Sequence, residues 1–504
     1  MINPAARPDK LPSLDIRALD PASAPRGSGY QQTAYVADSL IVFAHDPGTV
    51  QAAIARMVEP GVFARVTSIL PADLKPLGET AVKGLLKVTI SYESESVRSV
   101  DLVALMAQLQ REFGTNAVGL DHVVTTAPYL AGVPYLAGVP YLAGVPYLAG
   151  VPYLAGVPYL AGVSAMQEYG MPGFGGRAPV ALLLDDPARH TPMPSRRPVV
   201  AMLDTGLGAH PWFADAALAT DKVTYGSYLL GMYGNVPGAE WHQAPVDPLD
   251  GSLPSDAGHG TFICGIIRQV CPSARLLAIP VMAEDGVVAE SGLMATLLVL
   301  LHRHIDGVVH GNPDLVIDVL NLSLGYYHEN ADDIAFDGPF ASLLADFGAW
   351  GVAVVASAGN SGTTRPMYPA AFAAAPDEPG RVPQVTVGAL NADGTSVAYF
   401  SNAGAWVTAH RIGASLVSTV PTTLSGDAQP AAGLMYQGLH RTTPDPDAYA
   451  SGFATWSGTS FAGPVLAGEI ARALVSDPDL TTIDRGACVA RGRRAITTVH
   501  GRAT

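Results

Sequence analysis

Three residue types that can cooperate in breaking an acyl bond occur far apart in this sequence, each inside a short motif. Asp204 follows the apolar run Val200-Ala201-Met202-Leu203, His259 stands between two glycines, and Ser460 follows Gly458-Thr459. A serine hydroxyl is a poor nucleophile until a base takes its proton, and an imidazole base needs a carboxylate that fixes its tautomer. The three residues therefore predict a hydrolytic site with Ser460 as nucleophile, His259 as base and Asp204 as carboxylate.

Each motif alone also occurs in proteins where it does not form part of a catalytic triad. Asp-Thr-Gly also marks aspartic proteases, but those need two carboxylates that share a proton, and the sequence shows no second copy. A histidine between glycines is often structural, and Gly-Thr-Ser is common in loops. The joint presence of the motifs, in the order Asp, His, Ser, is what favours a catalytic reading, because this is the order known for subtilisin.

Residues 199 to about 480 resemble the catalytic domain of subtilisin-like serine proteases. The motifs that carry the resemblance are Asp204-Thr205-Gly206, Gly258-His259-Gly260-Thr261, Asn321-Leu322-Ser323-Leu324-Gly325, Ala358-Gly359-Asn360 and Gly458-Thr459-Ser460. The resemblance implies a serine endopeptidase that hydrolyses peptide bonds with Asp204, His259 and Ser460 as its triad.

The same resemblance implies roles for residues around the triad. Asn360 would donate its side-chain amide to the developing oxyanion, with the backbone N–H of Ser460 as the second donor. Ser323, Leu324 and Gly325 would form one wall of the substrate cleft and pair with an extended substrate as an added strand. Ala356, Ser357 and Ala358 would line the pocket for the side chain that precedes the scissile bond.

Four departures from the family pattern bear on specificity. Phe262 stands where many relatives carry a second histidine, Cys264 where a small residue is usual, and Gly463 where alanine is common. Residues 424 to 450 look like an added loop before the serine. None of these changes removes a catalytic group.

The pattern of apolar runs predicts the fold of this region. The runs are short, β-branched and continuous, as in strands buried on both faces of a parallel sheet. They lie at 199–203, 276–281, 316–322, 352–356 and 385–387, with helical segments at 292–309, 339–350 and 460–475. We therefore expect an α/β fold, a doubly wound parallel sheet of the subtilisin type.

A smaller α+β unit is expected before this sheet. Strands are predicted at 39–44, 62–70, 85–92 and 117–125, and helices at 49–58 and 102–113, with Ser99 placed to cap the second helix. The order β-α-β-β-α-β is the ferredoxin-like arrangement. In element order and position the unit resembles the inhibitory propeptide domain of subtilases, which would make it an intramolecular inhibitor of a proenzyme that processes itself. An unrelated ferredoxin-like interaction domain is the alternative.

Between the two units lie six perfect copies of Pro-Tyr-Leu-Ala-Gly-Val at 128–163. Proline and glycine in every unit exclude a helix and disfavour a central strand. The repeat is either a spacer or a peptide released by cleavage. The expected organisation is a flexible leader at 1–35, the inhibitor-like domain at 36–126, a repeat-containing linker at 127–197, the catalytic domain at 198–480 and a basic tail at 481–504.

Composition bounds the remaining function classes. A net charge of −15 argues against a nucleic-acid binder, and three cysteines do not make a disulfide framework. No signal peptide or uninterrupted apolar run of about 20 residues is evident, which favours the cytoplasm or export by a non-classical route. No cofactor or metal ligand is predicted, because no compact Asp-x-Asp loop is present, although structural calcium stays open. His302 and His304 are expected at the surface.

Two functional readings follow from these patterns. The first is an active endopeptidase whose partners are peptide or protein substrates and its own N-terminal domain. The second is a protease-derived binding protein that uses the cleft only to hold a peptide. The intact set of Asp204, His259, Asn360 and Ser460 favours the first.

Overall fold

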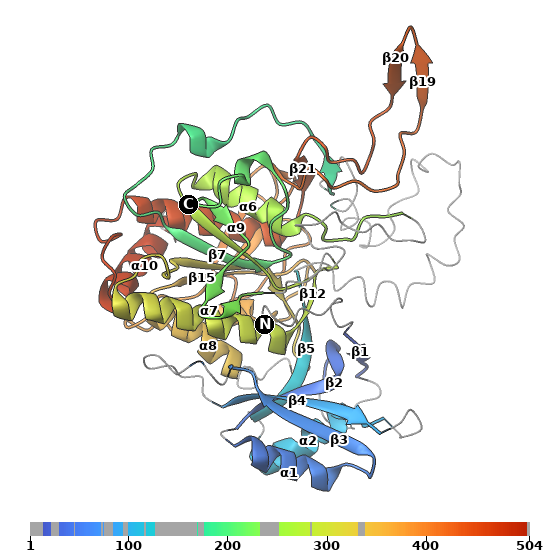
Figure 1. Ribbon diagram of the computed structural model, residues 1–504, viewed down its shortest axis with the longest axis vertical. Coiled ribbons are helices and arrows are strands. Elements are labelled where there is room, and N and C mark those ends of the chain that lie inside the picture. Colours follow the sequence, from blue (N-terminus) through green and yellow to red (C-terminus); the bar gives the residue numbers. More distant parts are fainter. Residues whose placement is uncertain are drawn as a thin grey trace.

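The computed structural model contains two packed units (Figure 1). It describes residues 14–21, 30–44, 46–71, 74, 84–93, 99–114, 117–126, 169, 176–231, 251–282, 285–330 and 338–500. The predicted repeat at 128–163 lies outside these residues, so its fate as spacer or cleaved peptide stays a prediction.

The larger unit is built on a parallel sheet of seven strands. Its order is β17-β16-β15-β13-β7-β11-β8, and every neighbouring pair is parallel. The strands are β7 (Val199–Asp204), β8 (Ala219–Thr220), β11 (Arg275–Pro280), β13 (Val319–Leu322), β15 (Ala353–Ser357), β16 (Val385–Leu390) and β17 (Ala409–Ile412). The doubly wound parallel sheet is therefore confirmed, and each predicted strand lies within a few residues of its expected place.

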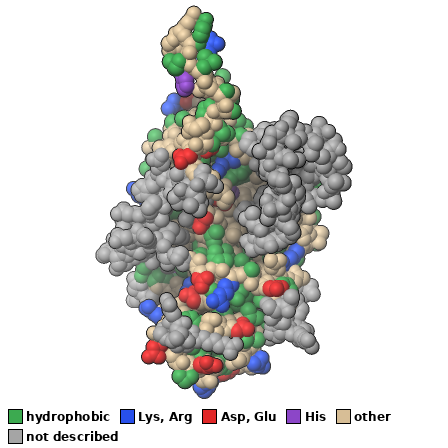
Figure 2. Space-filling view, turned by 90° about the vertical axis from the view of Figure 1, so that its right-hand side faces the viewer, with side chains coloured by type: hydrophobic (Ala, Val, Ile, Leu, Met, Phe, Trp, Pro, Cys, Tyr) green, Lys and Arg blue, Asp and Glu red, His purple; other side chains and the backbone are tan. Residues whose placement is uncertain are grey.

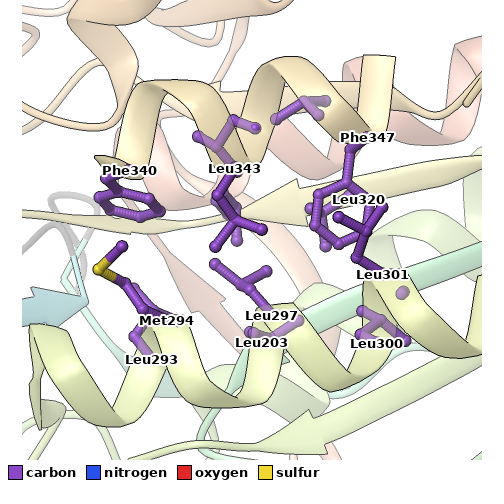
Figure 3. Close-up of a cluster of buried hydrophobic side chains, with 14 of the residues drawn as sticks. Leu203, Leu293, Met294, Leu297, Leu300, Leu301, Leu320, Phe340, Leu343 and Phe347 are labelled. Atoms are coloured by element: carbon purple, nitrogen blue, oxygen red, sulfur yellow. The ribbon is translucent and has the colours of Figure 1, made fainter. Parts of the chain in front are cut away.

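Helices cover both faces of this sheet because the side chains of each strand alternate between two cores. Ala201 and Leu203 of β7 belong to the core under α7 (Glu290–His310) and α8 (Gly338–Ala349). Val200 and Met202 belong to the core under α6 (His259–Val270) and α9 (Thr459–Val475). Figure 3 shows side chains of the first core: Leu203, Leu293, Met294, Leu297, Leu300, Leu301, Leu320, Phe340, Leu343 and Phe347.

Helix α7 passes the length and composition test for a membrane span, the one such helix among the described residues. Of its most apolar window, 78% is buried inside the structure. Burial against the sheet and α8 explains its apolar character as that of a core helix. His302 and His304, predicted at the surface, are also buried in α7. His304 is satisfied there by the Trp350 carbonyl and the Ile317 amide, at 3.0 and 3.1 Å.

Shorter elements complete this unit. They are β6 (Ala178–Pro179), β9 (Thr224–Tyr225), β10 (Tyr228–Leu229), β12 (Val287–Ala289), β14 (Leu324–Gly325), β18 (Leu416–Thr419), β19 (Gly433–Tyr436), β20 (Leu439–Thr442), β21 (Phe453–Trp456) and three 3₁₀ turns at Pro187–His190, Pro211–Phe213 and Ala370–Ala374. The segment interpreted as an added loop, 424–450, contains β19 and β20. Their hairpin projects from the rest of the molecule (Figures 1 and 2).

The smaller unit has the predicted ferredoxin-like topology. Its elements are β1 (Ile16–Leu19), β2 (Thr33–Phe43), α1 (Pro47–Met57), β3 (Val62–Ser68), β4 (Leu85–Tyr92), α2 (Leu102–Phe113) and β5 (Val118–Thr126). The strand order β5-β2-β4-β3 is antiparallel throughout. Two details differ from the prediction. Asp101, and not Ser99, caps α2, and part of the expected leader forms β1, which pairs with β2.

Strand β5 joins the two units. It pairs antiparallel with β12 on one side, Val287 opposite Thr125, and with β14 on the other, Leu324 opposite Thr126 and Gly325 opposite Thr125. The last strand of the small unit therefore lies between two short strands of the large unit and pairs with both. Figure 1 shows β5 reaching up from the small unit to β12.

Two segments expected to lie outside the catalytic unit are part of it. The predicted basic tail is helix α10 (Arg485–His500) up to residue 500, and the predicted linker includes β6, which pairs with β21. A buried ion triad ties both segments to the large unit, because Arg196 of the predicted linker and Arg491 of α10 bind the Asp318 carboxylate at 2.9 and 3.0 Å. Burial alone would raise the pKa of Asp318, but the two guanidinium groups outweigh it and hold that pKa below its usual value.

We expect Arg491→Met to lower the free energy of unfolding by about 3–5 kcal/mol, because removing one partner of a buried ionic group leaves charge uncompensated. Arg494→Met, on the same helix, is the control. The Arg494 side chain is 46% exposed in its pairs with Asp477 and Asp479, so its loss should cost about 1 kcal/mol or less. Urea unfolding at pH 7 measures both, and equal effects would contradict the structural role of the triad.

Candidate active site

Asp204 and His259 are brought together by the end of a strand and the start of a helix. Asp204 is the last residue of β7, and His259 is the first of α6. The two side chains are buried, and His259 Nδ1 lies 2.7 Å from Asp204 Oδ1. The same oxygen accepts the Thr205 N–H at 2.8 Å, which orients the carboxylate. The carboxylate on Nδ1 orients the imidazole and leaves Nε2 as its basic nitrogen.

A glycine permits this contact. At Gly260, a Cβ atom would overlap the Gly206 carbonyl oxygen and lie 2.9 Å from the Gly206 nitrogen. The first turn of α6 can therefore approach the loop after β7 only if residue 260 has no side chain. The Thr205 hydroxyl accepts the Gly260 N–H at 2.9 Å and ties the two segments together.

Ser460 lies in the first turn of α9, where backbone N–H groups have no partner within the helix. The turn is held from below by two buried hydroxyls. Ser323 Oγ donates to the Ser460 carbonyl at 2.8 Å, and Ser357 Oγ donates to the Thr459 carbonyl at 2.9 Å. Ser460 Oγ itself lies 3.4 Å from the Ser323 carbonyl oxygen.

Asn360 lies beside Ser460, and its amide is oriented by Thr459. Asn360 Oδ1 accepts both the backbone N–H and the hydroxyl of Thr459, each at 2.8 Å. Because the oxygen is engaged on that side, Nδ2 is directed toward Gly458, 3.5 Å from where a Cβ of that residue would lie. Asn402 fixes the loop that carries Asn360, since its Oδ1 accepts the N–H groups of Ser361 and Thr363.

His259, Asn360 and Ser460 line one cavity of about 620 Å³. Three further groups of this cavity were not found from the sequence. Trp456 packs edge-on to the His259 ring at a centroid distance of 5.6 Å. The Arg177 guanidinium lies over the Trp456 ring and donates to the carbonyls of Pro254 and Ala257, which precede His259. The third group is Asp256.

The predicted substrate-binding residues have two different positions. Leu324 and Gly325 form β14, and β5 pairs antiparallel with this strand, at the place where an extended substrate is predicted to pair. Ala356, Ser357 and Ala358 are buried and are not among the residues that line the cavity. The hydroxyls of Ser323 and Ser357 face α9, so these two side chains support the turn that carries Ser460. Spacing alone could not distinguish that support from substrate contact.

One buried cluster among the described residues has the composition of a metal site. His122, His328 and Glu329 bring potential ligand atoms within 4.8 Å of one another. These atoms already have protein partners. His122 of β5 lies between two carboxylates of the large unit, with Nδ1 2.7 Å from Glu290 and Nε2 2.8 Å from Glu329. His328 Nδ1 accepts the Asn330 N–H at 3.0 Å. The cluster is therefore an ionic contact between the units.

The charge state of this contact follows from its surroundings. Burial would lower the pKa of His122, but the Glu329 and Glu290 carboxylates outweigh that effect and hold its pKa well above the usual 6.5. Burial lowers the pKa of His328 to about 4, so that ring is neutral at pH 7. The His122 imidazolium thus lies between two carboxylates, with the Tyr326 ring stacked on it at 4.5 Å.

Comparison with known proteins assigns the larger unit to a family. The sequence profile described as Peptidase_S8, the subtilase family, matches residues 195–487. The serine protease AprX of Bacillus subtilis (strain 168) is 27% identical over 324 residues, covering 56% of this chain and 58% of AprX. Subtilisin BL of Lederbergia lenta is 26% identical over 293 residues, covering 56% of this chain and 78% of that protein. The chain thus spans little more than half the length of AprX.

Two solved structures have low similarity to this chain. A cold-adapted subtilisin-like serine proteinase has a TM-score of 0.35 and 20% identity, covering 62% of this chain and 87% of its own. A lanthipeptide protease has a TM-score of 0.36 and 21% identity, and the match covers 55% of this chain and 73% of that protease. At these scores, neither structure adds to what the sequence profile and the sheet topology establish.

We expect Gly260→Ala to separate His259 from Asp204 and to lower the free energy of unfolding by about 1–3 kcal/mol, the usual cost of overpacking. Gly292→Ala is the matched control in the first turn of α7, since its added Cβ would meet nothing closer than Val288 Cγ2 at 3.7 Å. Urea unfolding and the NMR signal of the hydrogen-bonded His259 Nδ1 proton measure the two effects. An unchanged proton signal in Gly260→Ala would contradict the close-approach argument.

Proposed function

Because this chain belongs to the subtilase family, we propose that it is a serine endopeptidase in which Ser460 is the nucleophile, His259 the general base and Asp204 the residue that orients the base. The observation that carries the proposal is the 2.7 Å contact between His259 and Asp204, at a cavity that Ser460 and Asn360 also line. AprX and subtilisin BL, named as proteases, support the assignment of substrate class to peptides and proteins.

The proposed reaction follows from the chemistry of these groups. His259 Nε2 takes the proton of Ser460 Oγ as the oxygen attacks the scissile carbonyl carbon. The Asp204 carboxylate holds Nδ1–H and stabilises the imidazolium that forms. His259 then returns the proton to the leaving amine as the C–N bond breaks, and a water molecule repeats the sequence to release the acyl group from Ser460.

The proposed oxyanion donors are Asn360 Nδ2 and the backbone N–H of Ser460. The two bonds from Thr459 to Asn360 Oδ1 support this role, because they leave the amide nitrogen on the cavity side. Donors held in place before the reaction stabilise charge as it develops, with no reorganisation in the transition state.

We also propose that the N-terminal unit inhibits the enzyme within the same chain and that the chain processes itself. The support is the position of β5, which pairs with the β14 edge and ends at Thr126, whose hydroxyl donates to Asp256 of the cavity lining. An unrelated interaction domain would not be expected to pair with the β14 edge, because an extended substrate needs that edge.

We expect Ser460→Ala to abolish peptide hydrolysis and to leave the chain at full length in mass spectrometry. Ser476→Ala, exposed just beyond the C-terminus of the same helix, should keep activity. Wild-type turnover by Ser460→Ala would refute the proposed nucleophile.

Asn360→Ala should lower kcat by about 10²–10³ with little change in KM, a magnitude taken from the loss of one such donor in subtilisin itself.

Inhibition by the N-terminal unit should weaken at alkaline pH. The pKa of His122 is raised when docked and returns toward 6.5 when free, so its contribution is complete below pH 6.5 and is lost as pH rises through the docked pKa. The inhibition constant of the separately made segment 14–126 should therefore increase by up to about tenfold per pH unit above 6.5.

Two variants test whether His122 causes that dependence. His122→Gln in the segment should flatten the alkaline rise, whereas His190→Gln in the enzyme, at a side chain that is 74% exposed, should leave it unchanged. A His122→Gln segment with the pH dependence of the unmodified one would assign the effect to another group.

A further inference from the structure

Asp256 is a buried carboxylate at the catalytic cavity that the proposed mechanism does not use. It lies three residues before His259, is only 4% exposed and lines the same cavity as His259 and Ser460. A carboxylate in such a place needs hydrogen-bond donors, since an unpaired buried charge is costly. Its own segment supplies one, the Ser255 hydroxyl at 2.6 Å from Oδ2.

The second donor comes from β5. Thr126, the last residue of β5, donates its hydroxyl to Asp256 Oδ1 at 2.7 Å, and both side chains are buried. The fit is close, because a Cβ at Gly286 would lie 2.6 Å from Thr126 Oγ1 and 2.7 Å from Asp256 Oδ2. Gly286 has a φ of +70°, so both conformation and space favour glycine there. The enclosed space suits a short side chain.

The register of β5 identifies which substrate residue would occupy this place. Thr126 lies opposite Leu324, so the next residue of any strand bound in the same register lies opposite Ser323. The Ser323 carbonyl oxygen is 3.4 Å from Ser460 Oγ. A substrate residue opposite Ser323 therefore presents its carbonyl to the nucleophile, and the residue in the place of Thr126 is the one immediately before it.

We propose that Asp256 forms a specificity subsite that selects a small hydroxyl side chain, Thr or Ser, at the second residue before the scissile bond. The inference rests on the proposed peptidase function and adds its substrate class: extended segments with a hydroxyl residue at that position. Valine has the shape of threonine but donates no hydrogen bond, so it would leave Asp256 Oδ1 without this partner. The free energy of that loss corresponds to a roughly 10- to 100-fold lower kcat/KM.

The test uses the active protein and internally quenched peptides Val-Val-Thr-Xaa-Ala-Leu-Ala, in which Xaa is Thr, Ser, Val or Ala. The first four residues of the Thr peptide copy Val123 to Thr126. Wild type should cleave after the Ala that follows Xaa, with kcat/KM for Thr and Ser about 10- to 100-fold above Val and Ala. Asp256→Ala should reduce the Thr/Val ratio to about 1, whereas Asp427→Ala, another carboxylate at the same cavity, should keep it.

Equal kcat/KM for the Thr and Val peptides in wild type, or a Thr/Val ratio that survives in Asp256→Ala, would overturn the subsite. Hydrolysis of none of the peptides would count against the peptidase function instead. The subsite then has a second readout in the full-length chain. Thr126→Val should speed hydrogen exchange of the β5 amides at least tenfold relative to Thr126→Ser, and equal exchange in the two variants would overturn the inference.

Discussion

The arrangement of the segments around the site depends on the contact between Asp204 and His259. It requires the end of β7 and the first turn of α6 to meet within hydrogen-bond distance, 2.7 Å between the two side chains. A parallel sheet supplies this geometry because the carboxyl ends of its strands meet helix N-termini at one edge. The same edge presents Asn360 after β15 and receives α9 with Ser460. Gly260 and the hydroxyls of Ser323 and Ser357 then bring these segments closer than ordinary packing would allow.

The N-terminal unit is bound to this edge by three kinds of contact that act together. Backbone pairing places β5 between β12 and β14. Asp121 of β5 accepts the N–H of Ser291 in the first turn of α7 at 2.9 Å and so caps a helix of the other unit. The His122 imidazolium pairs with Glu290 and Glu329. The first contact is independent of sequence, whereas the other two depend on buried charge. We therefore expect pH and the charges of these side chains to affect the binding of the N-terminal unit more than the strand pairing does.

The parts predictable from sequence are those coded locally. Continuous β-branched runs identified β7, β11, β13, β15 and β16, and an alternating pattern identified β4, because burial dictates residue type along a strand. The motifs located Asp204, His259, Asn360 and Ser460. The missed features depend on partners distant in sequence. Arg491 read as a tail residue because its partner, Asp318, lies 173 positions away. The contact between Thr126 and Asp256 could not be predicted, because it depends on the pairing of β5 with β14.

The central claim, that Ser460 is a nucleophile activated by His259, is tested most directly by covalent labelling with a fluorophosphonate. Such reagents react with a serine hydroxyl only when a neighbouring base makes it nucleophilic. Peptide mapping by mass spectrometry of the active protein should find one adduct, on Ser460, and none in His259→Ala. An unlabelled Ser460 in correctly folded active-form protein, or equal labelling of Ser460 in His259→Ala, would contradict the account.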